Sequence, residues 1–404
     1  MTEALARARE TFPATKNLTY LDAAAVSLIS QPTYDAIRAF LDLCIQPGSA
    51  DASRHHMVMD DMRSRAIGEA AILLNVDRDQ IALVESTTHG LNIAANAIPL
   101  EKGDQILIAD TEYLQVSIPW KMKEESAGVE IAPVHSGPNG HLTAGHFEEL
   151  MSDRTRVVCV SSVQWCSGNR IDLNALGEIC RSRDIYLVVD AIQHLGASPL
   201  DLQETPVDFL MAGGHKWLNA PFGCGVLYVS PRCVADLKPD SWGYLALEDP
   251  EGGWSEYFRR PEISPYSDWQ FKNTATKFEI AGTSNYPGAV GLGASLAQIN
   301  QLGIPTIHQH ILGLGEQLRS GLKELGARII SPGEVDEELR SGITIFSIYD
   351  SPDGDRALLD SLLDRGIYLA QRYTSGVGGL RASTHFYNNG EDVDRLLNAI
   401  EELT

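Results

Sequence analysis

The feature that most constrains the fold is a regular alternation of short apolar runs with helical patterns over the first 230 residues. The apolar runs lie at 81–85, 105–110, 129–135, 156–163, 186–190, 209–213 and 226–230, and most of them lead into helical patterns such as LNALGEICRSR. Strands that are almost continuously apolar are buried on both faces, as in parallel sheets covered by helices on each side. The pattern therefore predicts an α/β fold with a doubly wound, largely parallel sheet.

Residues 231–281 interrupt this rhythm with five prolines and many aromatic side chains, among them Trp242, Trp254 and Trp269. Long ordered loops in compact domains often cover active sites, so we expect such a cover here, with plain packing as the alternative. A helical pattern follows at 288–303, and then a strand-like run at 342–349 and further α/β patterns. These predict a second, smaller domain from about residue 290.

Composition excludes several classes of function. The 404 residues include 32 basic and 54 acidic side chains, a formal charge of −22, which disfavours nucleic acid and anionic membranes as partners. The N-terminus lacks the apolar core of a signal peptide, and no run has the roughly 18 apolar residues of a membrane helix. The six cysteines show no CxxC pair, so free thiols in the cytoplasm are expected and a metal site is not.

Polar residues follow the predicted strands, where open α/β sheets bind ligands. They are Ser86, Thr87, Thr88, Asp110, Glu112, Tyr113, Gln164, Trp165, Asp190, Gln193, His215 and Lys216. Each has an ordinary alternative, because hydroxyls cap helices, a carboxylate can close a turn and a lysine can extend to solvent. Together they are more specific: a lysine can form a Schiff base, a carboxylate can hold a pyridine nitrogen protonated, and a helix N-terminus can bind phosphate. These are the requirements of pyridoxal 5'-phosphate.

The combination resembles class V of the fold-type I pyridoxal-phosphate enzymes, which includes cysteine desulfurases, C–S lyases and isopenicillin N epimerase-like proteins. The motifs that carry the resemblance are ESTTHGLN, VQWCSGNRIDL, VVDAIQHLGA, AGGHKW, KFEIAGTSN and LRASTHFYN. It implies a large domain (20–289) with a mostly parallel, seven-stranded type of sheet, and a small domain made of 1–19 and 290–404. It also implies a homodimer that acts on a small amino-acid substrate.

The resemblance also implies roles for individual residues. Lys216 matches the Schiff-base lysine that moves protons at the substrate Cα, and Asp190 matches the partner of the pyridinium nitrogen. The other matches on the cofactor side are Gln164 and Gln193 near the phenolic oxygen, Thr87, Thr88 and His215 in the phosphate cup, and Tyr113 as the stacked ring, with a packed core aromatic as its alternative. Thr283 matches a residue that reaches the phosphate bound by the partner subunit.

On the substrate side, Arg381 matches the arginine that binds the α-carboxylate through two hydrogen bonds. Arg372 precedes it in the same motif region. His55 falls at the expected entrance of the active site, where a solvated helix start is an equal alternative.

One departure from the family bears on the reaction. Cysteine desulfurases carry a nucleophilic cysteine on a loop shortly before the matching arginine, whereas LAQRYTSGVGG (369–379) has none, and Cys166 is interpreted as structural. We therefore expect a C–S lyase that acts by β-elimination on a cysteine derivative. Transamination or oxidative deamination, epimerisation with Tyr113 or a histidine as second acid, and a non-enzymatic binding protein are the alternatives.

Overall fold

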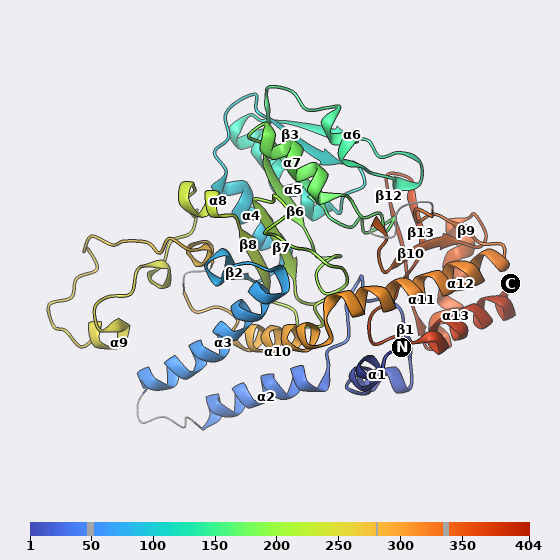
Figure 1. The fold of residues 1–404 in the computed structure, drawn as a ribbon, viewed down its shortest axis with the longest axis horizontal. Helices are drawn as coiled ribbons and strands as arrows, with labels where there is room; N and C mark the ends of the chain where they lie inside the picture. The colour runs from blue at the N-terminus through green and yellow to red at the C-terminus, as the bar shows by residue number, and fades with distance from the viewer. Residues whose placement is uncertain (47–51, 280–281, 334–338) are drawn as a thin grey trace.

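A seven-stranded sheet forms the centre of the molecule. The computed structural model describes residues 1–46, 52–279, 282–333 and 339–404 (Figure 1). The strands run in the order β2-β8-β7-β6-β5-β3-β4, and only β8 is antiparallel to its neighbours. Their bounds are β2 Ile81–Val84, β3 Gln105–Ala109, β4 Glu130–Val134, β5 Thr155–Ser161, β6 Tyr186–Asp190, β7 Phe209–Gly213 and β8 Gly225–Val229. The predicted fold class is confirmed.

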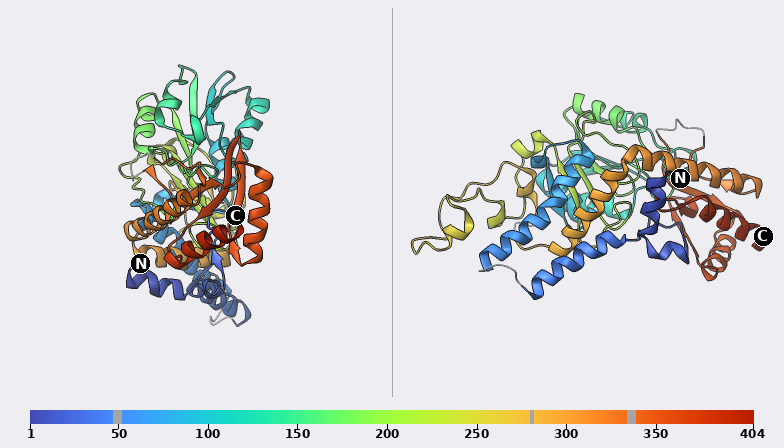
Figure 2. Two further views of the ribbon diagram at one scale, coloured as in Figure 1. Left: turned by 90° about the vertical axis from the view of Figure 1, so that its right-hand side faces the viewer. Right: turned by 60° about the horizontal axis from the view of Figure 1, so that its bottom comes forward.

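Helices cover both faces of this sheet because its strands have apolar side chains on both sides. One face packs against α4 (Thr87–Ala97), α5 (Leu114–Ala127) and α8 (Pro231–Asp236). The other packs against α3 (Ala52–Leu74), α6 (Ala144–Glu148), α7 (Leu173–Ser182) and α10 (Tyr286–Leu302). The long helix α2 (Gln31–Ile45) lies alongside α10 and extends with α3 away from the sheet (Figures 1 and 2).

A smaller antiparallel sheet forms the C-terminal part, in the order β12-β13-β10-β9. Its strands are β9 Arg328–Ile329, β10 Ile343–Ser347, β12 Ala370–Thr374 and β13 Val377–Ser383, and the helices α11 Ile304–Glu324, α12 Pro352–Asp364 and α13 Gly390–Leu403 pack on it. The N-terminus joins this part: β1 (Thr19–Tyr20) pairs with β11 (Ile367–Tyr368), and Arg9, in the last turn of α1 (Glu3–Glu10), bonds Asp392 at 2.7 Å. Segments at the two ends of the sequence are therefore adjacent in space.

The aromatic segment forms a lobe that projects from the body of the molecule, around the short helix α9 (Gly253–Tyr257) (Figure 1). Its rings pack on one another around an apolar cavity of about 540 Å³. None of its described residues lines the cavity at the carboxyl ends of the central strands in the same chain. We expect this segment either to cover the active site or simply to pack, and within one chain it packs.

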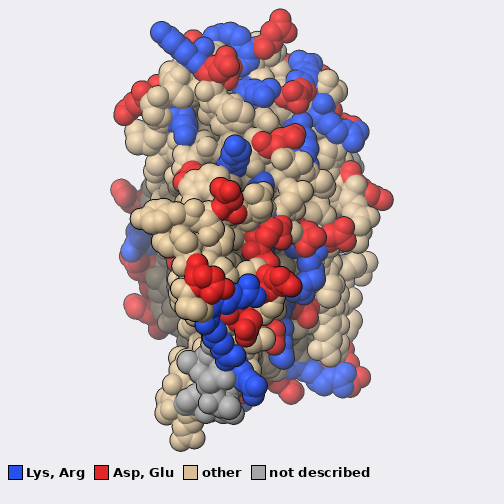
Figure 3. Space-filling view, turned by 90° about the vertical axis from the view of Figure 1, so that its left-hand side faces the viewer, with Lys and Arg blue, Asp and Glu red and all other residues tan. Residues whose placement is uncertain are grey.

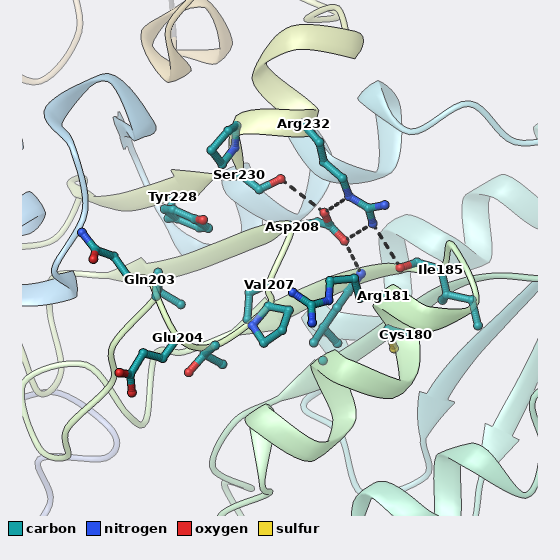
Figure 4. Close-up of a pocket in the computed structure, with 16 residues that line it drawn as sticks. Cys180, Arg181, Ile185, Gln203, Glu204, Val207, Asp208, Tyr228, Ser230 and Arg232 are labelled. Carbon is teal, nitrogen blue, oxygen red and sulfur yellow. Dashed lines mark hydrogen bonds and ion pairs between the residues drawn. The ribbon is translucent and has the colours of Figure 1, made fainter.

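Surface charge and one further small cavity are two more features of the molecule. Figure 3 shows acidic and basic side chains interspersed on one face of the molecule. A small cavity between β6 and α8 has Asp208 at its wall, and this carboxylate is bound by Arg232 at 2.5 and 2.7 Å and by the amide of Leu187 (Figure 4). Asp208 is therefore satisfied internally. No helix in the described ranges is both long and apolar enough to cross a membrane.

Candidate active site

The candidate site is a cavity of about 460 Å³ at the carboxyl ends of the central strands. Segments that follow β2, β3, β5, β6 and β7 meet the hairpin β12–β13 there, together with residues 24–26. The polar and aromatic residues of its lining are Ser86, Thr87, Thr88, Tyr113, Gln115, Ser161, Trp165, Asp190, Gln193, His215, Lys216, Arg372 and Arg381. The strand ends thus converge, as expected for an open α/β sheet.

Lys216 lies in the turn after β7 with its amine inside this cavity. Within the described residues its Nζ has no hydrogen-bond partner, and it lies 5.9 Å from the centre of the Tyr113 ring. Burial lowers the pKa of Lys216 to about 8, with Asp190 acting in the opposite direction. About a tenth of the amine is therefore neutral at pH 7, far more than in an ordinary lysine, and a nucleophilic lysine requires this neutral form.

Asp190 ends β6 and is almost fully buried. Its Oδ1 accepts a hydrogen bond from the amide of Ile192 at 2.9 Å, and burial raises the pKa of Asp190 to about 6. No basic side chain among the described residues bonds this carboxylate. A buried carboxylate without a cationic partner is suited to a ligand that brings a positive charge.

The N-terminus of α4 forms one end of the cavity. Ser86 caps the helix by accepting from the amide of His89 at 3.1 Å, and Thr87 Oγ1 accepts from the amide of Gly213 at 2.9 Å. Thr88 and His215 complete this end, and the His215 ring stacks on Phe222 with centres 4.6 Å apart. Burial lowers the pKa of His215 to about 4, so it is a neutral donor here beside the positive end of the helix dipole.

Arg381 lies on β13 at the opposite end and is buried. Its Nη2 donates to Asp22 at 3.2 Å and its Nη1 to the carbonyl of Trp165 at 3.3 Å. Its Nε is buried and has no partner in the described part of the chain. Arg372 on β12 lines the same end. This end is cationic, and one guanidinium donor is unsatisfied, which fits a carboxylate ligand.

Two aromatic rings form a wall between these ends. Tyr113 precedes α5 and contacts Trp165 edge to face, with ring centres 5.2 Å apart. The Trp165 indole donates to the carbonyl of Thr111 at 3.1 Å, which fixes its orientation. The face of each ring is flat and apolar, as a stacked heteroaromatic ring would need.

Four predicted residues lie differently from the others. Gln164 is fully buried below the cavity, where it donates to Glu112 and accepts from the Thr111 hydroxyl. Gln193 lines the cavity, but its side-chain amide is already used: it donates to the carbonyl of Ala24 and accepts from the Trp217 indole. Thr283 is exposed and His55 lies on α3, and neither lines the cavity of its own chain. Their contacts with cofactor or substrate stay predictions.

Sequence reasoning missed the part played by Asp22 and Glu112. Asp22 reaches Arg381 only because the N-terminal segment pairs with β13 through a bridge to Ser383, 361 positions along the chain (383 − 22). No local pattern indicates such a contact. Glu112 stands among the strand-end residues, but its burial depends on β5 and the loop after it.

The sequence model described as aminotransferase class-V matches residues 19–396, almost the whole chain. The chain belongs to this family. Two relatives of this class-V protein are a probable cysteine desulfurase of Methanothermobacter thermautotrophicus (27% identity, 98% of this chain and 97% of the relative) and an uncharacterised aminotransferase of Schizosaccharomyces pombe (30%, 80% and 77%).

Solved structures share the fold of this class-V protein. A cysteine desulfurase of Thermococcus onnurineus superimposes with a TM-score of 0.83 at 24% identity, covering 98% of this chain and 97% of that one. A cystine C–S lyase in complex with cysteine persulfide gives 0.83 at 24% identity, covering 96% and 98%.

The class-V protein is a pyridoxal-phosphate-dependent enzyme, as the sequence predicted. The donor set fits this cofactor on its own chemistry: an amine of lowered pKa and a buried carboxylate, neither with a hydrogen-bonded ion-pair partner among the described residues, and a hydroxyl-lined helix N-terminus beside a neutral histidine. Lys216, Asp190, Thr87, Thr88 and His215 are the residues that would hold it.

Proposed function

We propose that the enzyme is a C–S lyase that releases a sulfur leaving group from a cysteine derivative by β-elimination. When bound, pyridoxal phosphate withdraws electrons from the substrate Cα and so acidifies its proton. The rest of the chemistry belongs to the side chains of this chain.

Each end of the cavity has a separate task. Arg381, with its free Nε and the adjacent Arg372, binds the substrate α-carboxylate and orients the Cα. Lys216 Nζ then accepts the proton from Cα, a role that its lowered pKa supports. Asp190 stays ionised at neutral pH and balances positive charge at the far side. Tyr113 and Trp165 restrict motion of the bound groups between these ends.

The observation that carries the choice of reaction is the distribution of thiols. Residues 370–383 form a tight hairpin, with Ser375 and Gly376 at its turn, and none of the six cysteines lines the cavity. Burial raises the pKa of Cys166 to about 12, so this neighbouring thiol is not a nucleophile. A transferred sulfur would have no acceptor on the enzyme, whereas elimination needs none. Two relatives named cysteine desulfurase and cystine C–S lyase handle sulfur amino acids.

The test is a panel of S-substituted L-cysteines incubated with the holoenzyme. Pyruvate and ammonia in equal amounts support elimination. A keto acid that retains the substrate side chain would indicate transamination or deamination instead, and a change in optical rotation without either product would indicate epimerisation.

We also propose a homodimer in which Thr283 contacts the cofactor phosphate bound by the partner subunit. The exposure of Thr283 supports this arrangement, as do the apolar side chains of Leu41, Ile45 and Met57 that α2 and α3 present to solvent. We further propose that residues 20–289 form the large domain and that residues 1–19 and 290–404 together form the small domain. We also propose a cytoplasmic location, which agrees with the six free thiols.

A further inference from the structure

Glu112 is a buried carboxyl group directly beneath the cavity, and the proposed mechanism does not use it. It lies between β3 and α5, is almost fully buried, and has no cation within bonding distance among the described residues. Three donors surround it instead: the amide of Ser161, the hydroxyl of Ser161 and the side-chain amide of Gln164. Such a costly group calls for a function.

The two oxygens of Glu112 differ in their partners. Oε1 accepts from the Ser161 amide at 2.7 Å and from Gln164 Nε2 at 2.8 Å. Gln164 is held in this orientation because its own Oε1 accepts from the Thr111 hydroxyl at 3.0 Å. Two N–H donors saturate Oε1, so a proton on Glu112 must reside on Oε2. Among the described residues, the Ser161 hydroxyl is the hydrogen-bond partner of that oxygen.

Ser161 connects this carboxyl group to the cavity. It is the last residue of β5, it lines the cavity, and it is paired in register with Asp190 on the neighbouring parallel strand β6. Side chains paired in this way project from the same face of a sheet. The Ser161 hydroxyl bonds Glu112, and Ser161 lines the same cavity as Asp190.

We propose that Glu112 and Ser161 form a proton relay that sets the hydrogen-bonding role of the Ser161 hydroxyl toward the bound cofactor. When Glu112 is ionised, Ser161 donates its proton to Oε2 and offers only lone pairs to the cavity. When Glu112 takes up one proton, Oε2 donates to Ser161, and the serine proton is free to point into the cavity. Protonation proceeds by one step in which Ser161 passes its proton to Oε2 and gains one from the cavity solvent.

The surroundings place this change near neutral pH. Burial raises the pKa of Glu112 to about 7, its hydrogen bonds oppose this, and the charge of Asp190 on β6 adds to it. Two further titratable groups interact electrostatically with Glu112: Cys159 on β5 and Cys166, which follows this strand. Burial raises the pKa of both thiols, so they stay neutral, whereas the charge of Asp190 acts on Glu112.

The relay requires bound cofactor but does not depend on the elimination reaction. A negative lyase assay would therefore not contradict it. Its test uses the holoenzyme in wild-type form and as Glu112→Gln, Ser161→Ala and the control Glu148→Gln, an exposed glutamate on α6 that pairs with Arg183. Infrared difference spectra and the visible absorbance of the bound cofactor are recorded from about pH 5 to about pH 9.

We expect the wild type and Glu148→Gln to lose the carbonyl band of a protonated carboxylic acid as pH rises, with a cofactor absorbance change at the same midpoint. In Glu112→Gln the band with a midpoint near pH 7 and the absorbance change should both be lost, whereas the band of Asp190, whose pKa is about 6, remains. In Ser161→Ala the infrared band of Glu112 should remain, at a shifted frequency. The change in cofactor absorbance at the midpoint of that band should disappear. A band with a midpoint near pH 7 that persists in Glu112→Gln, or an absorbance change that survives in Ser161→Ala with an unshifted band, would overturn the relay.

Discussion

At the scale of single residues, the lowered pKa of the Lys216 amine determines how cofactor is captured. The fraction of neutral amine falls about tenfold for each pH unit below a pKa. Since burial lowers this pKa to about 8 rather than raising it, uptake of pyridoxal phosphate by the apoenzyme should speed up as pH rises toward 8 and level off above it. Stopped-flow absorbance measures the rate, and a rate that keeps rising through pH 10 would contradict the lowered pKa.

Replacement of Lys216 tests its covalent role. Lys216→Ala should bind the cofactor without its covalent visible band and should lose all turnover, because no other amine lines the cavity among the described residues. Lys121→Ala, which removes an exposed lysine on α5, is the control and should behave as wild type. Turnover that survives in Lys216→Ala would refute the assignment.

Arg381 tests carboxylate recognition. Lysine keeps the charge but cannot make paired hydrogen bonds or keep the contact with the Trp165 carbonyl, so Arg381→Lys should lower kcat/KM roughly 10- to 100-fold. Most of the loss should appear in KM. Steady-state kinetics measure it, with Arg356→Lys on the exposed face of α12 as control. An unchanged KM would exclude Arg381 from substrate binding.

At the scale of secondary-structure elements, the hairpin β12–β13 carries both arginines of the cavity. Gly378 has a φ of +147°, and a Cβ there would collide with the carbonyl oxygen of Arg372. Gly376, at the turn, has a φ of +77° but open space around it. Gly378→Ala should therefore lower the free energy of unfolding by about 2–3 kcal/mol and raise KM, against about 1 kcal/mol for Gly376→Ala.

Urea unfolding and kinetics of the two glycine variants make this comparison. Equal effects of both substitutions would show that the approach of Gly378 to Arg372 does not hold the hairpin in place.

The central sheet could be predicted from the sequence because its strands are apolar on both faces, so period and length identify them without tertiary information. The strand-end residues from Thr87 to Lys216 could be predicted for the same reason, since topology brings such ends together. The contact of Asp22 with Arg381 could not, because it depends on pairing between the two ends of the chain. The burial of Gln164 beneath the cavity and the packing of the aromatic segment into a separate lobe could not be predicted either, because both depend on tertiary contacts that leave no local sequence pattern.

At the scale of the whole molecule, the proposed dimer predicts that two inactive subunits complement each other. Lys216→Ala supplies an intact Thr283, and Thr283→Ala supplies an intact Lys216. If each cavity uses Thr283 of the partner subunit, random exchange of equal amounts should restore about a quarter of wild-type activity, since half of the dimers are mixed and each has one intact site.

Activity after unfolding and refolding the mixture, compared with each variant refolded alone, gives the result. Two outcomes would contradict the shared site: no gain over the separate variants, or a monomer by analytical ultracentrifugation.

The ratio of pyruvate to alanine formed from one sulfur amino acid tests the proposed reaction most directly. L-Cystine and S-substituted cysteines are incubated with the holoenzyme, and both products are quantified together with ammonia. Since no cysteine lines the cavity to accept sulfur, we expect pyruvate and ammonia in equal amounts and no alanine. Alanine as the main product, with sulfur bound to an enzyme thiol, would contradict a C–S lyase and establish a desulfurase.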